Sequence, residues 1–483
     1  MTIKLTQKSS MLLLLSFTEM WERFSYYGMR ALLVLFLTST LGFADSKAYA
    51  IYSLFAAIGY AVPMLAGILA DKLIGFQRTL IIGAIIMCLG HLSMAISDQS
   101  EFILYCGLSL IAVGTGFFKG NITSVLGTLY TSAETKQRDK SFSLFNVAIN
   151  MGSLIASLSC GYVAHKFGWH YGFALAGIGM VLGLLTFLRF RHILGEHGNK
   201  PNQSSTKQNT TLRSALIKAI SVAIILCLVV LGLFNNSEAS LRYLSITGII
   251  AFIFLAKVFF QCNNNERIRI LTLLILTIFF VGFIAVEMQL GSLMNLFTLR
   301  NVNKSILGYE ISAASLQALN PFFVILFGSL FASIFAKFGH TAYMKRFAIG
   351  LLINIICFMV IVLGCSKATE GLVNLNYVII SMACMSFVEI CLFPMIQVLF
   401  TALAPERYKG FMMGILLFGI SYSNMASIII AKFMSIPKEH IDNSSVSLII
   451  YQSGFQTITF FAIGLFICFM IVAPFLNRVI KQA

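Results

Sequence analysis

The sequence predicts an all-α polytopic membrane protein, and composition and hydropathy carry that prediction. Of the 483 residues, 58% are hydrophobic and only 11% are charged, and the mean hydropathy is +0.88. Soluble domains carry about 25% charged residues, so this chain is too apolar to be one. Apolar runs of about 20 residues, the length of a membrane-spanning helix, recur along the whole chain.

The apolar runs can be assigned to fourteen spans, and one polar stretch divides them. Residues 189–213, which read RFRHILGEHGNKPNQSSTKQNTTLR, are a flexible linker by composition. They separate six spans from eight. The predicted spans are residues 11–40, 48–70, 79–97, 102–130, 141–164, 169–189, 214–234, 240–260, 268–297, 312–338, 344–365, 375–403, 410–433 and 451–477.

The two spans that follow the linker are expected to be additions to the core bundle. Residues 214–234 and 240–260 contain no acid, and their few basic residues lie near the ends, so both are expected to face lipid. Removing them leaves six spans plus six, the arrangement of two-lobed secondary transporters. The predicted domains are an N-terminal six-helix lobe at 1–189, a linker with two additional helices at 190–267, and a C-terminal six-helix lobe at 268–483.

The distribution of basic residues predicts the orientation. Lys and Arg are concentrated in the segments that face inside when the N-terminus is inside, so both termini are expected to be cytoplasmic in the bacterial inner membrane. The same bias accounts for most of the net charge of +16 without a nucleic-acid partner. The ten cysteines are scattered singly and are expected to be small core residues.

The first span carries formal charges in a segment otherwise suited to lipid. Each ionisable group at a helix centre costs on the order of 2.5–3.5 kcal/mol, so these charges must be paired or hydrated. Helical geometry places the polar side chains within an arc of about 140°, which predicts that this face lines a cavity or meets another helix. A purely structural charge network is the alternative. The polar face comprises Glu19, Glu22, Arg23, Tyr26, Tyr27 and Arg30.

Other spans supply polar groups that could complete a site. A lone lysine in a membrane needs an acid, and Glu22 is the expected partner of Lys119. For the asparagines, a purely structural role as interhelical hydrogen-bond donors stays open. An unpaired carboxylate either finds a cation or takes up a proton, and both outcomes suit a proton-coupled protein. The candidates in these spans are Lys119, Asn150, Glu287, Gln317, Asn320 and Glu389.

Several function classes lack their sequence signatures. The chain contains no Walker loop, dinucleotide fingerprint, metal-ligand cluster or nucleophile elbow. The glycine-rich GTGFFKG lies within a predicted span and lacks the spacing of a phosphate-binding loop. We therefore expect no enzyme, no bound metal and no cofactor, with protons as the only coupling ion.

The polar motifs resemble those of the proton-dependent oligopeptide transporter (POT) family of the major facilitator superfamily. EMWERFSYYGMRALL (Glu19–Leu33) is similar to the family's E-x-x-E-R-F-x-Y-Y-G signature, and GILADKLIGFQRT (Gly67–Thr79) to the superfamily's loop between helices two and three. GTGFFKGN, AINMGSLIA and LAPERYKGFMMG resemble further family motifs, in the family's order and in both lobes. The resemblance implies the major facilitator fold, with two six-helix lobes plus two extra helices.

The resemblance also implies a role for each matching residue. A peptide carboxylate would be received by the cations Arg23, Arg30 and Lys119. The pocket would be lined by Tyr26, Tyr27 and Tyr60. The peptide's amino terminus would be received by Asn150, Asn320 and Glu389. Proton coupling would involve Glu19, Glu22, Lys119 and Glu287, with Glu22 paired to Lys119 or to Arg23.

The sequence departs from the family pattern mainly in the second lobe. Phe393 stands where serine is common, and Glu287 is displaced by one residue from the usual acid. In the first lobe, Gly120 replaces a usual proline and Asn146 a usual tyrosine. The seventh and eleventh bundle helices also lack tryptophan. These changes bear on the range of substrates more than on the fold.

The function expected from these residues is proton-coupled symport of di- and tripeptides by alternating access, performed by a monomer in the lipid bilayer. One alternative keeps the transport mechanism and changes the cargo to another small organic solute, such as a modified amino acid or a peptide-like compound. The other alternative is a membrane receptor that does not transport.

Overall fold

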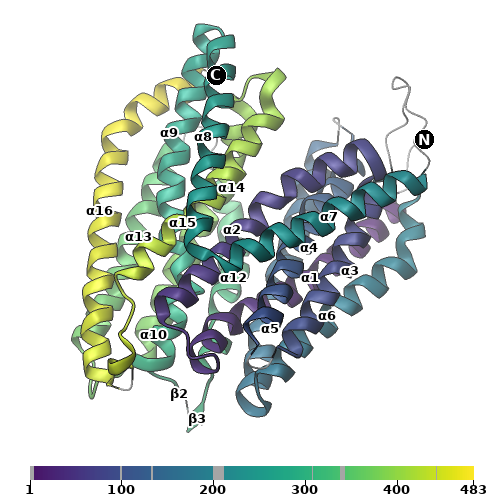
Figure 1. Ribbon diagram of the computed structural model, residues 1–483. Helices are drawn as coiled ribbons and strands as arrows, with labels where there is room; N and C mark the ends of the chain where they lie inside the picture. Colours follow the sequence, from purple (N-terminus) through teal and green to yellow (C-terminus); the bar gives the residue numbers. More distant parts are fainter. Residues whose placement is uncertain are drawn as a thin grey trace. The chain divides into compact units, whose positions relative to one another are not determined.

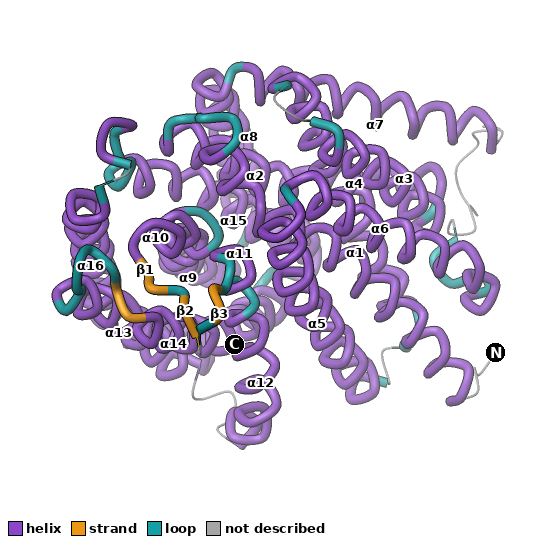
Figure 2. Tube along the Cα trace, turned by 90° about the horizontal axis from the view of Figure 1, so that it is seen from below, coloured by secondary structure: helices purple, strands orange, loops and turns teal. Residues whose placement is uncertain are grey.

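The computed structural model describes residues 5–97, 100–131, 134–199, 212–306, 308–337, 343–441 and 443–482. The chain is built mainly of helices (Figures 1 and 2). Within the described residues, 11 helices are long and apolar enough to cross a membrane. The first helix is not among them, because its central charges interrupt the apolar sequence.

Each predicted span contains one helix or two consecutive helices. The helices of the first half are α1 (Leu5–Ser39), α2 (Asp45–Leu69), α3 (Phe76–Ala95), α4 (Glu101–Thr128), α5 (Thr135–Phe167), α6 (Trp169–Phe190) and α7 (Leu212–Asn235). Those of the second half are α8 (Ser237–Gln261), α9 (Asn264–Glu287), α10 (Leu293–Asn301), α11 (Ala313–Leu316), α12 (Leu319–Lys337), α13 (Tyr343–Ser366), α14 (Leu375–Leu403), α15 (Lys409–Lys432) and α16 (Ser444–Gln482).

Two predicted spans are interrupted. The span at 268–297 is divided into α9 and α10 by a short turn, Met288–Leu290, and the span at 312–338 into α11 and α12. The polar residues Glu287, Gln289 and Gln317 lie at these breaks, but hydropathy averaged over a whole span is dominated by the apolar neighbours and assigns each run to one continuous helix. Four two-residue strands lie in the connections: β1 (Val302–Asn303) pairs in parallel with β4 (Val373–Asn374), and β2 (Ser305–Ile306) pairs antiparallel with β3 (Tyr309–Glu310).

Local sequence explains where several helices begin and end. Gly75 and Gly168 have φ angles of +83° and +110°, and each lets the chain turn from one helix directly into the next. Ser100 caps α4 by accepting a hydrogen bond from the backbone of Ile103. Asn263 starts α9 with a reciprocal capping box to Glu266.

The helices group into two compact units by their contacts. Unit 1 comprises Met1–Leu41, Ile58–Asn236 and Ala314–Ala318. Unit 2 comprises Gly42–Ala57, Ser237–Ala313 and Leu319–Ala483. The division into lobes at 1–189, 190–267 and 268–483 stays a prediction.

Glycines bring α3 and α4 of unit 1 into close contact. A Cβ atom added at Gly83 of α3 would lie 2.7 Å from the carbonyl oxygen of Gly114 of α4, so the two backbones are in contact. Gly90 and Gly107 repeat this close approach two turns further along. Such contacts between small residues are a usual way to pack membrane helices.

Hydrogen bonds fix the first half of α2 within unit 2. The hydroxyls of Ser53 and Ser427 lie 3.0 Å apart, and the hydroxyl of Ser421 donates to the carbonyl of Ala57 at 2.9 Å. Gln289 donates to the carbonyl of Ser427 at 3.0 Å. The segment before Ile58 therefore packs against α15, while the rest of α2 belongs to unit 1.

The polar stretch predicted as a linker is partly ordered, so that part of the prediction is wrong. α6 continues to Phe190, and the Gln77 side chain then donates to the carbonyls of Gly195 and His197 at 3.3 and 2.6 Å. These bonds tie the chain to the start of α3. Residues 200–211, the rest of the predicted linker, lie outside the described residues.

Candidate functional site

The charged face of α1 forms a buried ion cluster. Arg23 is 2% exposed, and its guanidinium donates to both carboxylate oxygens of Glu22, which is fully buried. Its Nε atom also lies 3.3 Å from Oε1 of Glu19, one helical turn away. One cation is thus held between two carboxylates, which offsets the cost of burying all three charges.

Tyrosines on the same helix lie against the cations. The Arg23 guanidinium lies 5.0 Å from the ring centroid of Tyr26 and 5.9 Å from that of Tyr27. The Arg30 guanidinium lies 5.9 Å from the Tyr27 centroid. At these distances the ring faces attract cationic groups. The structure therefore brings together the residues that the sequence placed on one face of the first span.

Lys119 of α4 lies close to this cluster but does not pair with it directly. Its ammonium lies 4.7 Å from the ring centroid of Tyr60, and its charge interacts with that of Glu19. Among the described residues Lys119 forms no ion pair, so of the two partners expected for Glu22 the structure shows Arg23, and the pair with Lys119 is absent. The reason is that Arg23, the neighbour of Glu22, already occupies both of its carboxylate oxygens.

Asn150 of α5 belongs to the same unit as the cluster. Its side-chain amide donates to the carbonyl of Asn146, one turn earlier, at 2.9 Å. Two residues further, Gly152 packs against the backbone carbonyl of Met20 in α1, so α5 lies directly beside the charged helix. The predicted contact of Asn150 with a peptide amino terminus stays a prediction.

A second polar group lies in unit 2, between α12 and α14. The amide of Asn320 donates to Oε1 of Glu389 at 2.6 Å and to the hydroxyl of Ser386 at 3.2 Å. Ser386 in turn donates to the backbone carbonyl of Asn320 at 3.0 Å. Sequence reasoning missed Ser386, although its position three residues before Glu389 placed it on the same face of α14.

The remaining predicted residues of unit 2 lie on α9 and α14. Glu287 is the last residue of α9 and is half-buried. Phe393 makes edge contacts with Phe280 and Phe283, with centroid separations of 5.1 and 6.4 Å. The predicted meeting of both polar groups at one central cavity stays a prediction.

Comparison with known proteins identifies the family. A profile of the POT family matches residues 77–447. "Dipeptide and tripeptide permease A" of Citrobacter koseri is 30% identical over 466 residues, covering 96% of this chain and 92% of that protein. The permease of the same name from Erwinia pyrifoliae is 29% identical, with 96% and 93% covered.

Solved structures agree with the sequence comparison. Tetrameric PepTSo2 superposes with a TM-score of 0.86 at 25% identity, covering 98% of this chain and 99% of that one. A peptide transporter POT in complex with alafosfalin superposes with a TM-score of 0.81 at 29% identity, covering 97% and 95%. This likeness confirms the predicted all-α membrane fold of the major facilitator type, with two six-helix lobes and two extra helices. The chain belongs to the POT family.

Proposed function

We propose that this protein is a proton-coupled symporter that imports di- and tripeptides by alternating access. One observation carries the proposal: Arg23 is held between Glu19 and Glu22, with Lys119 and three tyrosines beside it. Two of its relatives are named dipeptide and tripeptide permeases, which supports the choice of cargo.

The cluster offers a way to couple protons to cargo. Protonation of Glu19 or Glu22 removes one of the negative charges that hold Arg23 in place. The carboxylate of an entering peptide can then take the position of the neutralised acid beside Arg23 or Lys119. Proton and peptide thus bind in a mutually dependent way, which is what symport requires.

The polar group of unit 2 supplies the complementary charge. Glu389, held by Asn320, is a carboxylate suited to a peptide's ammonium group. A dipeptide is a zwitterion, so cations on one helix group and an acid on another match its two ends. Contacts to the two termini leave the peptide side chains less constrained, which favours a broad range of peptides.

The membrane potential can drive this cycle. A potential of 100 mV offers about 2.3 kcal/mol per charge, which corresponds to roughly fifty-fold accumulation per proton. The proposed location is the bacterial inner membrane with both termini cytoplasmic. The proposed transport unit is the monomer, which moves its cargo without chemical change and without a cofactor.

A second candidate cargo is a modified amino acid or another peptide-like solute. Phe393 favours it, because this ring packs against Phe280 and Phe283 where the family commonly has a serine hydroxyl. A larger apolar surface in unit 2 would suit side chains or substituents that ordinary dipeptides lack.

Uptake into proteoliposomes tests the proposal. Purified protein is reconstituted, and uptake of a labelled dipeptide is measured with an inwardly directed proton gradient and a potential negative inside. We expect accumulation that collapses when a protonophore is added and that unlabelled di- and tripeptides inhibit. Accumulation without inhibition by ordinary peptides would favour the second cargo, and no uptake of any peptide would refute the proposal.

A further inference from the structure

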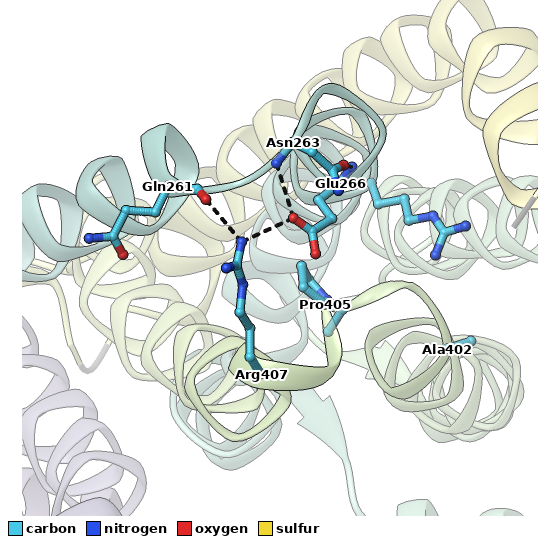
Figure 3. A pocket seen from close by; sticks show the side chains of 8 residues that line it. Gln261, Asn263, Glu266, Ala402, Pro405 and Arg407 are labelled. Carbon is cyan, nitrogen blue, oxygen red and sulfur yellow. Dashed lines mark hydrogen bonds and ion pairs between the residues drawn. The ribbon is translucent and has the colours of Figure 1, made fainter.

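A cavity of about 630 Å³ lies within unit 2, at the ends of four helices (Figure 3). It is formed where α8 ends and α9 begins, and where α14 ends and α15 begins. It is therefore at one face of the membrane-spanning region rather than at mid-membrane. Its lining residues are Gln261, Asn263, Glu266, Arg269, Ala402, Ala404, Pro405 and Arg407.

One guanidinium in the cavity is already engaged. Arg407 donates through Nη2 to the backbone carbonyl of Gln261 at 2.9 Å, and the same nitrogen lies 3.2 Å from Oε2 of Glu266 (Figure 3). The same Glu266 oxygen accepts from the backbone amide of Asn263 at 3.0 Å. Glu266, the only acid among the lining residues, is thus neutralised by Arg407 and by the start of α9.

The second guanidinium is not neutralised. Arg269 lines the cavity and is half-buried, and it has no hydrogen-bond or ion-pair partner in the part of the chain that the structure describes. A guanidinium carries five donors, so a half-buried one calls for an acceptor such as a phosphate or carboxylate. The lining side chains carry two positive charges and one negative charge, which leaves the cavity positive.

Exposed apolar side chains stand next to the cavity residues. Phe260 is 72% exposed beside Gln261, while Ile268 and Leu271 are each 42% exposed on either side of Arg269. In a membrane protein these side chains meet acyl chains. A ligand that carries both an anionic group and apolar chains could pair with the guanidinium in the cavity and also contact the exposed apolar side chains beside it.

We propose that this cavity binds the phosphate of an anionic phospholipid, with Arg269 as the main donor and Arg407 as the second. Basic pockets between helices at a membrane face bind anionic head groups in this way. The orientation proposed above places the site in the cytoplasmic leaflet. The site concerns lipid rather than cargo, and its test does not depend on transport.

Binding to the full-length protein in neutral detergent tests the proposal. Short-chain dioctanoyl phosphatidylglycerol, dioctanoyl phosphatidylcholine and inorganic phosphate are titrated separately, and saturable shifts of the thermal unfolding midpoint give apparent Kd values. We expect phosphatidylglycerol to bind about tenfold or more tightly than the zwitterionic lipid, and Arg269→Gln to weaken it by about the same factor.

Three further variants sharpen the test. Arg269→Lys should keep part of the affinity, since it keeps the charge but not the fork of donors. Glu266→Gln should tighten binding, because it removes the cavity's acid and retains a residue that can cap α9. Arg478→Gln alters an exposed arginine that does not line the cavity, and should leave the apparent Kd for phosphatidylglycerol unchanged.

Each other outcome overturns the proposal. If Arg269→Gln binds phosphatidylglycerol as the unmodified protein does, Arg269 is not a lipid ligand. If inorganic phosphate binds as tightly as phosphatidylglycerol, the ligand is a soluble phosphate. If Arg269→Gln does not fold, unchanged affinity in both Arg269→Lys and Glu266→Gln refutes the site.

Discussion

Arg300 and Asp45, separated by 255 positions in the sequence, form a bidentate ion pair within unit 2. The two guanidinium nitrogens lie 2.7 and 2.9 Å from the two carboxylate oxygens, and Asp45 is fully buried. Asp45 also accepts from the backbone amide of Ile436, and Arg300 donates to the hydroxyl of Tyr451. This network fastens the start of α2 to α10 and α16.

Asp45→Ala should therefore destabilise the protein. Removing the carboxylate leaves the nearly buried Arg300 without its counter-charge, and breaking such a pair costs about 3–5 kcal/mol. Thermal unfolding in detergent would show a lower midpoint. Asp139→Ala is the control, because Asp139 and its partner Arg138 are 71% and 45% exposed, and exposed pairs contribute about 0–1 kcal/mol. Equal effects of the two variants would contradict this assignment.

The pair between Asp45 and Arg300 could not be predicted from the sequence. The charged face of α1 was predictable, because helical periodicity relates residues that are near in sequence. Asp45 and Arg300 lie at helix ends far apart in the chain, where no periodic pattern indicates a partner. The same holds for Lys119, whose neighbours depend on how α4 packs and whose expected pair with Glu22 did not form.

The fold was predictable for a similar reason. Most of the membrane-spanning helices coincide with runs of apolar residues, so their positions could be predicted from hydropathy. The breaks that separate α9 from α10 and α11 from α12 fall at single polar residues such as Gln289 and Gln317, which the average hydropathy of a whole span does not resolve. The hydropathy pattern also could not predict that Gly42–Ala57 belongs to unit 2, because this depends on hydrogen bonds such as that between Ser53 and Ser427.

Glu389→Gln should weaken the binding of peptides that carry a free amino terminus. The variant keeps an acceptor for Asn320 but removes the negative charge. Because a charge-assisted hydrogen bond contributes about 1.5–3 kcal/mol, the apparent affinity for these peptides should fall about tenfold or more. Competition of dipeptide uptake measures this. The apparent affinity for N-acetylated peptides, which lack the ammonium group, should change little. An equal fall in affinity for both kinds of peptide would show that Glu389 does not bind the amino terminus.

Phe393→Ser should change the range of cargo. The substitution removes the ring that packs against Phe280 and Phe283 and restores the hydroxyl common in the family. Relative to the unmodified protein, peptides with polar side chains should compete better for uptake and those with bulky apolar side chains worse. An unchanged ranking across a panel of dipeptides, with the protein folded and active, would place Phe393 outside the determinants of specificity.

Glu134 should make stability depend on pH in the acid range. It lies between α4 and α5, where hydrogen bonds from the Lys8 ammonium at 2.6 and 2.8 Å and from the backbone of Thr131 lower its pKa from 4.5 to about 2. A carboxyl group with a lowered pKa stabilises the fold above its unfolded-state value, and that stabilisation is lost as pH falls towards 2.

Thermal unfolding between pH 2 and pH 7 checks this dependence. The unmodified protein should be more stable than Glu134→Gln above about pH 5, and the difference should shrink between about pH 4.5 and pH 2. Lys8→Gln should give the same profile, because it removes the donor that lowers the pKa most. A difference that is constant over the whole range would contradict the prediction.

In the proposed function, the cations beside the α1 acids couple proton movement to peptide movement, and the variant Lys119→Ala removes one of these cations. Proteoliposomes containing this variant are assayed for proton-driven dipeptide uptake and for counterflow exchange without a gradient. Lys166→Ala is the matched control, because Lys166 also lies against a tyrosine ring, at 5.6 Å from the centroid of Tyr162, but is exposed. We predict that Lys119→Ala loses proton-driven uptake and keeps counterflow, while Lys166→Ala keeps both. Proton-driven uptake by Lys119→Ala at the rate of the unmodified protein would show that Lys119 does not couple protons to peptide.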